Sequence, residues 1–420
     1  MAEIVFAAGA PHAPGLVGLL GAAPADVKDV VQDMYAQIRA QMLETRPDVL
    51  IVVANDHLAN SRVRTYPDFL LGMAPEHRGP YEWFKEWIGC RDYVVQGRPD
   101  VSEAIFRGMN QRGHRLFAER ENLRFDDNIS VPSVMLKLDT TGIALVPILQ
   151  NCTVPPFPDQ KQSYEFGKVL ADVIRNDLPA GLRVALLGSG GLSHEPGGAR
   201  YFFIDRDFDL WFLELMASGD HERMLRELTI DRMENAGAGG TSELLAWLVV
   251  LGAIGPCKGR QSGYAVHADF KCGIGGVVWD LHGAKFDATH APPAPPPPVA
   301  LPLGDPPPAR LADFDPTLAG HDLVQDLKWN PPLREEFATN EAAVLDRYAL
   351  RPQERAAIEQ RDFRTLYDMG FHPYLGGQLA RFIFGNTAGK GATIAVQKLV
   401  ASLRGKQAEE FGKDQGVVKQ

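Results

Sequence analysis

The sequence has few cysteines and no excess of basic residues. Only four cysteines occur in 420 residues (Cys90, Cys152, Cys257 and Cys272), and no CxxC pair is present. A disulfide framework or a zinc site built from thiolates is therefore not expected, and this usage fits a reducing cytoplasm. The 43 basic and 53 acidic side chains give a formal net charge of -10. A nucleic-acid partner is not expected, because phosphate contacts require a basic excess.

Long hydrophobic runs are also lacking. The longest apolar run, Leu244–Ile254, is too short to span a bilayer. The N-terminal segment has no basic leader and is interrupted by Pro11 and Pro14, so it does not resemble a signal peptide. We therefore expect a cytoplasmic protein with no membrane partner. The content of 45% hydrophobic and 23% charged residues is typical of a folded globular chain.

The first 285 or so residues alternate between strand-like and helix-like patterns. Expected strands are Glu3–Ala8, Val49–Ala54, Ala144–Leu149 and Arg183–Gly188, and expected helices include Asp26–Leu43 and Tyr164–Arg175. Continuous apolar strands separated by helices are typical of a sheet that is covered on both faces. We predict an α/β fold, with a large domain over residues 1–287.

A proline-rich tract divides this unit from the rest of the chain. Residues 288–310 read ATHAPPAPPPPVALPLGDPPPAR, a composition that favours extended backbone and predicts a linker. Residues 311–420 follow with helical patterns, including Leu333–Arg347 and Tyr374–Phe384, and with no obvious strand. We predict a small all-α C-terminal domain.

Three histidines occupy the same kind of position in the first unit. His12, His57 and His194 each follow one of the expected strands by a few residues. In an open parallel sheet, ligands bind beyond the carboxyl ends of the strands. A single histidine in a loop is usually an ordinary surface residue, but three in equivalent places favour a common site.

A carboxylate could complete a metal site, and Glu243 is the best candidate. It lies in NAGAGGTSELLAWLVVLG, in the first turn of an expected helix. An acidic residue in a first turn also favours the helix dipole without any metal, so both interpretations stay open. Two histidines and one carboxylate form the facial triad of non-haem Fe(II) oxygenases, although the same ligands can hold zinc.

Two other features have less specific interpretations. Asp56 either orients the neighbouring His57 or belongs to a turn. Trp83 and Trp87 lie four residues apart on one helix face and are expected to pack rather than to line a site.

These motifs together resemble the type II extradiol ring-cleaving dioxygenases, the protocatechuate 4,5-dioxygenase and gallate dioxygenase group. The first 285 residues resemble the catalytic β subunit of that group. The segment LKWNPPLREEFATNEAAVLDRYALRPQERAAIEQRDFRTLYDMGFHPYL resembles the small helical α subunit. The two parts are fused here through the proline tract, as in gallate dioxygenases.

The resemblance assigns roles to individual residues. His12 in GAPH and His57 in NDH resemble the two histidine ligands of Fe(II), and Glu243 resembles the carboxylate ligand. His194 in GGLSH resembles the acid/base residue, and Tyr374 in MGFHPYL resembles a residue that lines the substrate pocket. The implied enzyme is an Fe(II)-dependent homodimer that opens a catechol-type ring with O2.

The chain departs from the family pattern at one catalytic position. RFDDNISVPS has Asp127 where family members usually have an active-site histidine, and a carboxylate accepts hydrogen bonds but cannot be a cation. Asp269 and Lys271, in YAVHADFKC, lie where the family holds the substrate carboxylate. The expected substrate is gallate, protocatechuate or a 3-O-methylgallate-like compound. An aminophenol or dihydroxypyridine substrate, a zinc-dependent hydrolase and a non-catalytic relative are the alternatives.

Overall fold

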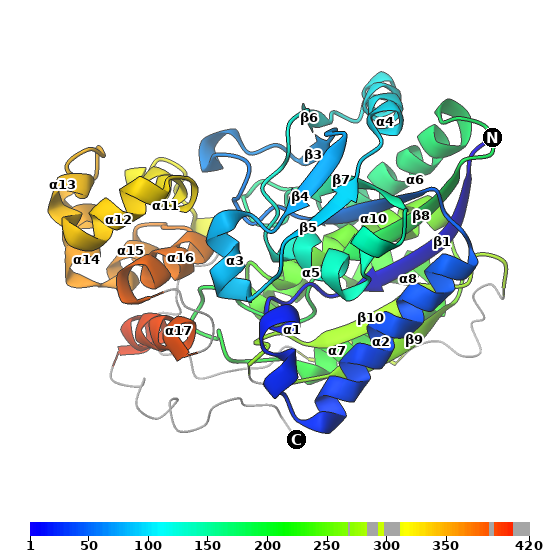
Figure 1. Cartoon of the computed structure of the whole chain (residues 1–420). Helices are drawn as coiled ribbons and strands as arrows, with labels where there is room; N and C mark the ends of the chain where they lie inside the picture. The colour runs from blue at the N-terminus through cyan, green and yellow to red at the C-terminus, as the bar shows by residue number, and fades with distance from the viewer. Residues whose placement is uncertain (268, 284–292, 298–310, 386–389, 406–420) are drawn as a thin grey trace.

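The protein is built in layers, with helices on both faces of a mixed eight-stranded sheet (Figure 1). The structure, a computed structural model, describes residues 1–267, 269–283, 293–297, 311–385 and 390–405. Within these ranges, no helix has the length and apolar character needed to cross a bilayer. The predicted α/β fold with a C-terminal helical part is confirmed.

The sheet has the strand order β6-β3-β7-β2-β8-β1-β10-β9. The strands are β1 (Glu3–Ala10), β2 (Val49–Asn55), β3 (Phe69–Gly72), β6 (Phe117–Glu119), β7 (Ala144–Gln150), β8 (Arg183–Ser189), β9 (Gly259–Ala265) and β10 (Ile274–Trp279). Strands β7, β2, β8 and β1 are parallel, whereas β3 and β10 run antiparallel to their inner neighbours. A separate ribbon pairs β4 (Glu76–Gly79) with β5 (Tyr93–Gln96). The parallel centre brings the carboxyl ends of four strands to one edge.

Side chains of the central strands alternate between two cores. Ile51 and Val53 of β2 pack with helices on one face, and Val52 and Ala54 pack with helices on the other. The helices of this part are α1 (Gly15–Gly18), α2 (Ala25–Glu44), α3 (Glu82–Ile88), α4 (Pro99–Gln111), α5 (Asp127–Met135), α6 (Gln160–Asp177), α7 (Arg206–Ser218), α8 (His221–Glu227), α9 (Ile230–Gly237) and α10 (Leu245–Ile254), with the 3-10 turn η4 (Thr241–Leu244) before α10. Burial on both faces explains the continuous apolar strands.

The C-terminal part is helical throughout its described residues. It contains α11 (Ala319–Trp329), α12 (Pro331–Thr339), α13 (Glu341–Leu345), α14 (Pro352–Gln360), α15 (Phe363–Asp368), α16 (Pro373–Phe384) and α17 (Lys390–Arg404). The single helix predicted over Leu333–Arg347 is wrong. Asn340 ends α12, and its side chain accepts a hydrogen bond from the backbone of Ala343 to begin α13.

The C-terminal helices pack on the loops at the carboxyl edge of the sheet (Figure 1). Leu58, Val63 and Val154 from these loops belong to the same apolar cluster as the helices. The helical part therefore covers the edge at which the sequence predicts a site. Most of the linker predicted at 288–310 lies outside the described residues, so the domain boundaries stay a prediction.

Candidate active site

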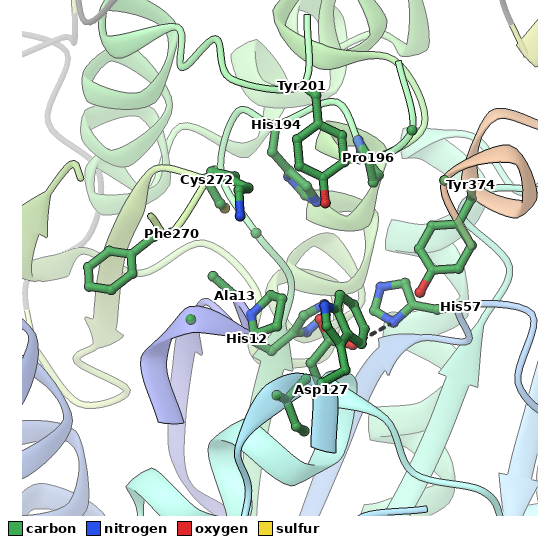
Figure 2. A pocket seen from close by; sticks show the side chains of 18 of the residues that line it. His12, Ala13, His57, Asp127, His194, Pro196, Tyr201, Phe270, Cys272 and Tyr374 are labelled. Carbon is green, nitrogen blue, oxygen red and sulfur yellow. Dashed lines mark ion pairs between the residues drawn. The ribbon is translucent and has the colours of Figure 1, made fainter. Parts of the chain in front are cut away.

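A pocket at the carboxyl edge of the sheet is lined by residues from every part of the chain (Figure 2). The predicted site residues all line it: His12, His57, Asp127, His194, Glu243, Asp269, Lys271 and Tyr374. Its cavity has a volume of about 90 Å³ and opens to solvent.

Two histidines of the pocket direct the same ring nitrogen at Glu243. Nε2 of His12 lies 3.0 Å from Oε2 of Glu243, and Nε2 of His57 lies 2.8 Å from Oε1. Two ligand atoms about 2.1 Å from one metal, at right angles, lie about 3.0 Å apart. Both histidine nitrogens therefore lie at the spacing from the Glu243 carboxylate that two ligands of one metal have.

The other nitrogen of each imidazole is held from behind. Nδ1 of His12 lies 3.0 Å from the Ser189 hydroxyl at the end of β8. Nδ1 of His57 lies 3.0 Å from Oδ1 of Asp126 and 3.2 Å from Oδ1 of Asp127. Metal-binding histidines usually donate their second N–H to partners of this kind, which fixes the ring and its tautomer.

Several buried polar atoms at this site lack a hydrogen bond within the described residues. Nε2 of His12 has no partner of acceptable geometry among the described residues, although Glu243 is 3.0 Å away. A divalent cation between His12, His57 and Glu243 would bind this nitrogen together with Nε2 of His57 and the Glu243 carboxylate. The residues present fit such an ion.

Asp127 is a weaker candidate for the third ligand. His12, His57 and Asp127 offer ligand atoms that all lie within 4.8 Å of one another. However, Asp127 approaches Nδ1 of His57, on the side of the ring away from Glu243. Asp126, which the sequence reasoning missed, makes the closer contact to that nitrogen and also caps α5. Asp56 belongs to a turn, since its carboxylate accepts from Ala59 and Asn60.

The charges of the site favour an ionised carboxylate between imidazoles. Burial raises the pKa of Glu243, but His12, His194 and His57 outweigh burial and hold this pKa well below its usual range. Burial lowers the pKa of His57, but Asp126 and the other carboxylates raise it well above its ordinary value. In the metal-free protein, His57 therefore holds a proton that a cation must displace.

His194 lies beside the three proposed ligands. Its Nδ1 lies 2.8 Å from the Leu192 carbonyl, which leaves Nε2 facing Glu243 at 3.5 Å. Burial lowers the pKa of His194, but Cys272 and Glu243 outweigh burial and raise it well above its ordinary value. This imidazole can hold a proton close to a bound substrate.

Glycines at the end of β8 allow the Glu243 segment to approach the sheet. A Cβ on Gly190 would lie 2.6 Å from the Glu243 carbonyl oxygen, and one on Gly188 would lie 2.8 Å from Cα of Trp247. The backbone N–H of Gly191 donates to Oε2 of Glu243 at 3.0 Å. The GSGG sequence thus serves close backbone packing beside the predicted ligand.

The helical part contributes residues to the same pocket. Tyr374, at the start of α16, stacks on His57 with ring centroids 5.4 Å apart and an interplanar angle of 10°. Its hydroxyl is buried and has no hydrogen-bond partner among the described residues. Lys328 of α11 is fully buried behind His57, and burial lowers its pKa to about 8 although Asp126, Asp56 and Asp127 oppose this.

Two cations mark another side of the pocket. Arg381 of α16 donates to the Tyr201 hydroxyl at 2.8 Å and lies over the Trp87 ring at 4.1 Å. Lys271 lines the same pocket with a left-handed backbone φ of 56°. Neither makes an ion pair within the described part of the chain, and Nε of Arg381 has no hydrogen-bond partner there. Trp87 packs against the core, as expected, and also lines this pocket.

Comparison with known proteins identifies the family. Residues 6–271 match the family described as the catalytic LigB subunit of aromatic ring-opening dioxygenase. The chain belongs to this family. Residues 321–415 match the LigA subunit of the aromatic-ring-opening dioxygenase LigAB, in agreement with the helical part described above. The resemblance to extradiol dioxygenases that the motifs suggested is confirmed.

Several curated relatives are similar over part of the chain. A 2,3-dihydroxyphenylpropionate/2,3-dihydroxicinnamic acid 1,2-dioxygenase 2 of Pseudomonas putida is 29% identical over 172 residues, which cover 41% of this chain and 51% of the relative. A gallate dioxygenase of Pseudomonas putida is 29% identical over 123 residues, 29% of this chain and 35% of the relative. A 2,3-dihydroxyphenylpropionate/2,3-dihydroxicinnamic acid 1,2-dioxygenase of Rhodococcus rhodochrous is 22% identical over 299 residues, which cover 61% of this chain and 91% of the relative.

These matches differ in extent. The chain spans about half the length of the first dihydroxyphenylpropionate relatives that it matches. A solved structure of an uncharacterized Escherichia coli K12 protein matches with a TM-score of 0.43 and 14% identity over 65% of this chain and 99% of that one.

Proposed function

We propose that the protein is a non-haem Fe(II)-dependent extradiol dioxygenase that opens a catechol-type ring with both atoms of O2. The observation that carries the proposal is the convergence of His12 and His57 Nε2 on the Glu243 carboxylate at 3.0 and 2.8 Å. This ligand type, with positions left open, is characteristic of non-haem Fe(II) oxygenases. The zinc hydrolase alternative uses the same ligands but has no support from the family match.

Fe(II), when bound by His12, His57 and Glu243, would supply coordination positions for the two substrate oxygens and for O2 and would acidify a coordinated hydroxyl. His194 would accept the proton from that hydroxyl at Nε2 and hold it for return to an oxygen of the ring-opened product. Its Nδ1 contact with the Leu192 carbonyl keeps Nε2 directed into the pocket. Tyr374 would confine the ring beside His57 and offer its unpartnered hydroxyl to a substrate oxygen.

Asp127 has a supporting role in this proposal. Its Oδ1 lies 3.2 Å from Nδ1 of His57, close to the Asp126 oxygen that accepts the hydrogen bond from that nitrogen. A carboxylate there increases the basicity of the ligand nitrogen on the opposite side of the ring. Asp127 also lines the pocket and can accept a hydrogen bond from a substrate hydroxyl.

The substrate class that fits best is a catechol bearing a carboxylate. Lys271 and Arg381 line one pocket, and neither has an ionic partner among the described residues. Buried cations of like sign are unfavourable unless an anion joins them. Asp269 offsets this charge only in part, because it is more exposed and its Oδ2 lies 3.7 Å from His267. Relatives named for gallate and for dihydroxyphenylpropionate act on compounds of this class.

The activity is tested by O2 consumption of the full chain after reconstitution with Fe(II) and ascorbate. The panel is gallate, protocatechuate, 3-O-methylgallate, dihydroxyphenylpropionate, an uncharged catechol, an aminophenol and a dihydroxypyridine. We expect O2 uptake with a carboxylated catechol and a new absorbance of the ring-opened product. Hydrolytic activity with Zn(II) under argon, and no O2 uptake with Fe(II), would contradict the proposal.

Arg381→Met tests the substrate class. Loss of a charge-assisted contact should raise KM for the carboxylated substrate about 10- to 100-fold. KM for an uncharged catechol should change little, and Arg381→Lys, which keeps the charge, should be intermediate. An equal increase of KM for both substrates would contradict a role in binding the carboxylate. The homodimer and the cytoplasmic location stay predictions.

A further inference from the structure

The loop that carries His57 is held mainly by the helical part of the chain. Residues 56–63, here called the His57 loop, follow β2 directly. Helix α11 donates hydrogen bonds to four of its backbone carbonyls: Lys328 Nζ to His57 and Leu58 at 2.9 Å each, Trp329 Nε1 to Ala59 at 2.8 Å, and Gln325 Nε2 to Ser61 at 2.8 Å. Side chains more than 260 positions away therefore fix the backbone around a proposed metal ligand.

Lys328 is an unusual residue to find at this place. Its side chain is fully buried, and it makes no ion pair among the residues that the structure describes. A buried ammonium is costly unless hydrogen bonds compensate for the lost water. Here the compensation comes from two backbone carbonyls of the His57 loop, so the charge and the loop depend on each other.

The backbone of the His57 loop needs such support. Leu58 has a φ of 57°, a left-handed conformation that is unfavourable for a residue with a branched side chain. Conformations of this kind persist where surrounding contacts over-determine them. The Leu58 carbonyl accepts from Lys328 at 2.9 Å and from Gln325 at 3.4 Å.

The same ammonium also contacts the ring that covers His57. Nζ of Lys328 lies 5.7 Å from the centre of the Tyr374 ring and 5.6 Å from the centre of the Phe84 ring. Tyr374 in turn stacks on the His57 imidazole. The Lys328 ammonium thus contacts both the backbone of His57 and the Tyr374 ring that stacks on the His57 imidazole.

We propose that Lys328 is a positioning residue that sets the place of His57, so that the helical part completes the metal site instead of only covering the pocket. The inference rests on the metal site of the proposed function but does not depend on the reaction or the substrate. Metal binding and the docking of α11 on the His57 loop should then be energetically coupled.

The first test measures Co(II) binding by Lys328→Met in the full chain. Methionine has a similar volume but neither the charge nor the donors. We expect Co(II) to bind about 10- to 100-fold more weakly than to the wild type, with altered visible d–d absorption. Lys398→Met is the matched control, since exposed Lys398 lies 4.4 Å over the Phe384 ring of the same helical part and has no contact with the His57 loop. Unchanged affinity in folded Lys328→Met would overturn the inference.

The second test uses the wild type and does not depend on folding of a variant. Hydrogen exchange is compared with and without Co(II). We expect Co(II) to slow amide exchange in residues 56–63 and in α11, but not in α4, which packs on α6 and β3. Protection confined to the loop would overturn the inference and leave the metal site intact. A wild type that binds no Co(II) would overturn both the metal site and the inference.

Discussion

The two histidines that face Glu243 are supported by different parts of the molecule. His12 is held from within the α/β part, by the hydroxyl of Ser189 at the end of the neighbouring strand. His57 is held by two carboxylates of the α5 region and by side chains of α11 and α16. The first position is fixed once the sheet has formed, whereas the second also requires the helical part to be docked.

The difference also concerns charge. The partner of His12 is a neutral hydroxyl, while Asp126 and Asp127 place negative charge behind His57. A carboxylate behind an imidazole strengthens the opposite nitrogen as a ligand. We infer that His12, which follows β1, is held in a fixed position. The strength of His57, which follows β2, as a metal ligand depends on the charges behind its ring.

Glu243→Ala should have the largest effect, because it removes the group on which both sides converge. We expect loss of Fe(II) from the purified protein and loss of O2 uptake. Iron content after reconstitution measures this directly. Retention of a full equivalent of iron would show that another carboxylate, such as Asp127, completes the site.

His194→Gln should separate proton transfer from metal binding. His194 Nε2 lies 3.5 Å from Oε1 of Glu243, and its imidazole faces the pocket, where it can reach a bound substrate. We expect iron content to remain normal and turnover to fall about 100- to 10,000-fold. Normal turnover in an iron-loaded variant would exclude the acid/base role.

Asp126→Asn and Ser189→Ala compare the two supports. Asn keeps the size of the side chain behind His57 but removes its charge, and Ala removes the neutral partner of His12. We expect Co(II) affinity to fall about 10- to 100-fold for Asp126→Asn and less for Ser189→Ala. Equal losses would remove the distinction between a charged and a neutral support.

The pH dependence of Co(II) binding should show the smallest effect. Carboxylates raise the pKa of His57, so below that pKa the free protein holds a proton that Co(II) must displace. Affinity should therefore increase with pH, by at most about tenfold per pH unit for one proton, and level off above the raised pKa. Asp126→Asn removes one of the charges that raise this pKa and should shift the plateau to lower pH in the same titration.

The sequence was sufficient to indicate the part of this site that lies at the ends of the strands. The strands before His12, His57 and His194 are buried on both faces and therefore lack polar residues, which makes their ends visible in the sequence. Glu243 was open to two interpretations, and its place between two imidazoles supports the proposed role as a ligand.

The rest of the site depends on docking, which local patterns do not encode. Nothing in the local sequence distinguishes Lys328 or Arg381, and only the packing of α11 and α16 on the sheet edge buries them. The segment RFDDN has two adjacent acidic residues, and the family resemblance assigned a role only to the second, Asp127. Asp126 was therefore missed. Such assignments need the distances between segments far apart in the chain.

The glycines at the end of β8, which have no side chain, have a consequence for the interpretation of related sequences. At Gly190 even one added methyl group would collide with the Glu243 carbonyl, which cannot yield without shifting the turn that carries this carboxylate. A homologue could thus retain every imidazole and acid of the centre and still be unable to assemble it. A search of related sequences for the ligands should therefore also check that the positions equivalent to Gly188, Gly190 and Gly191 are glycine.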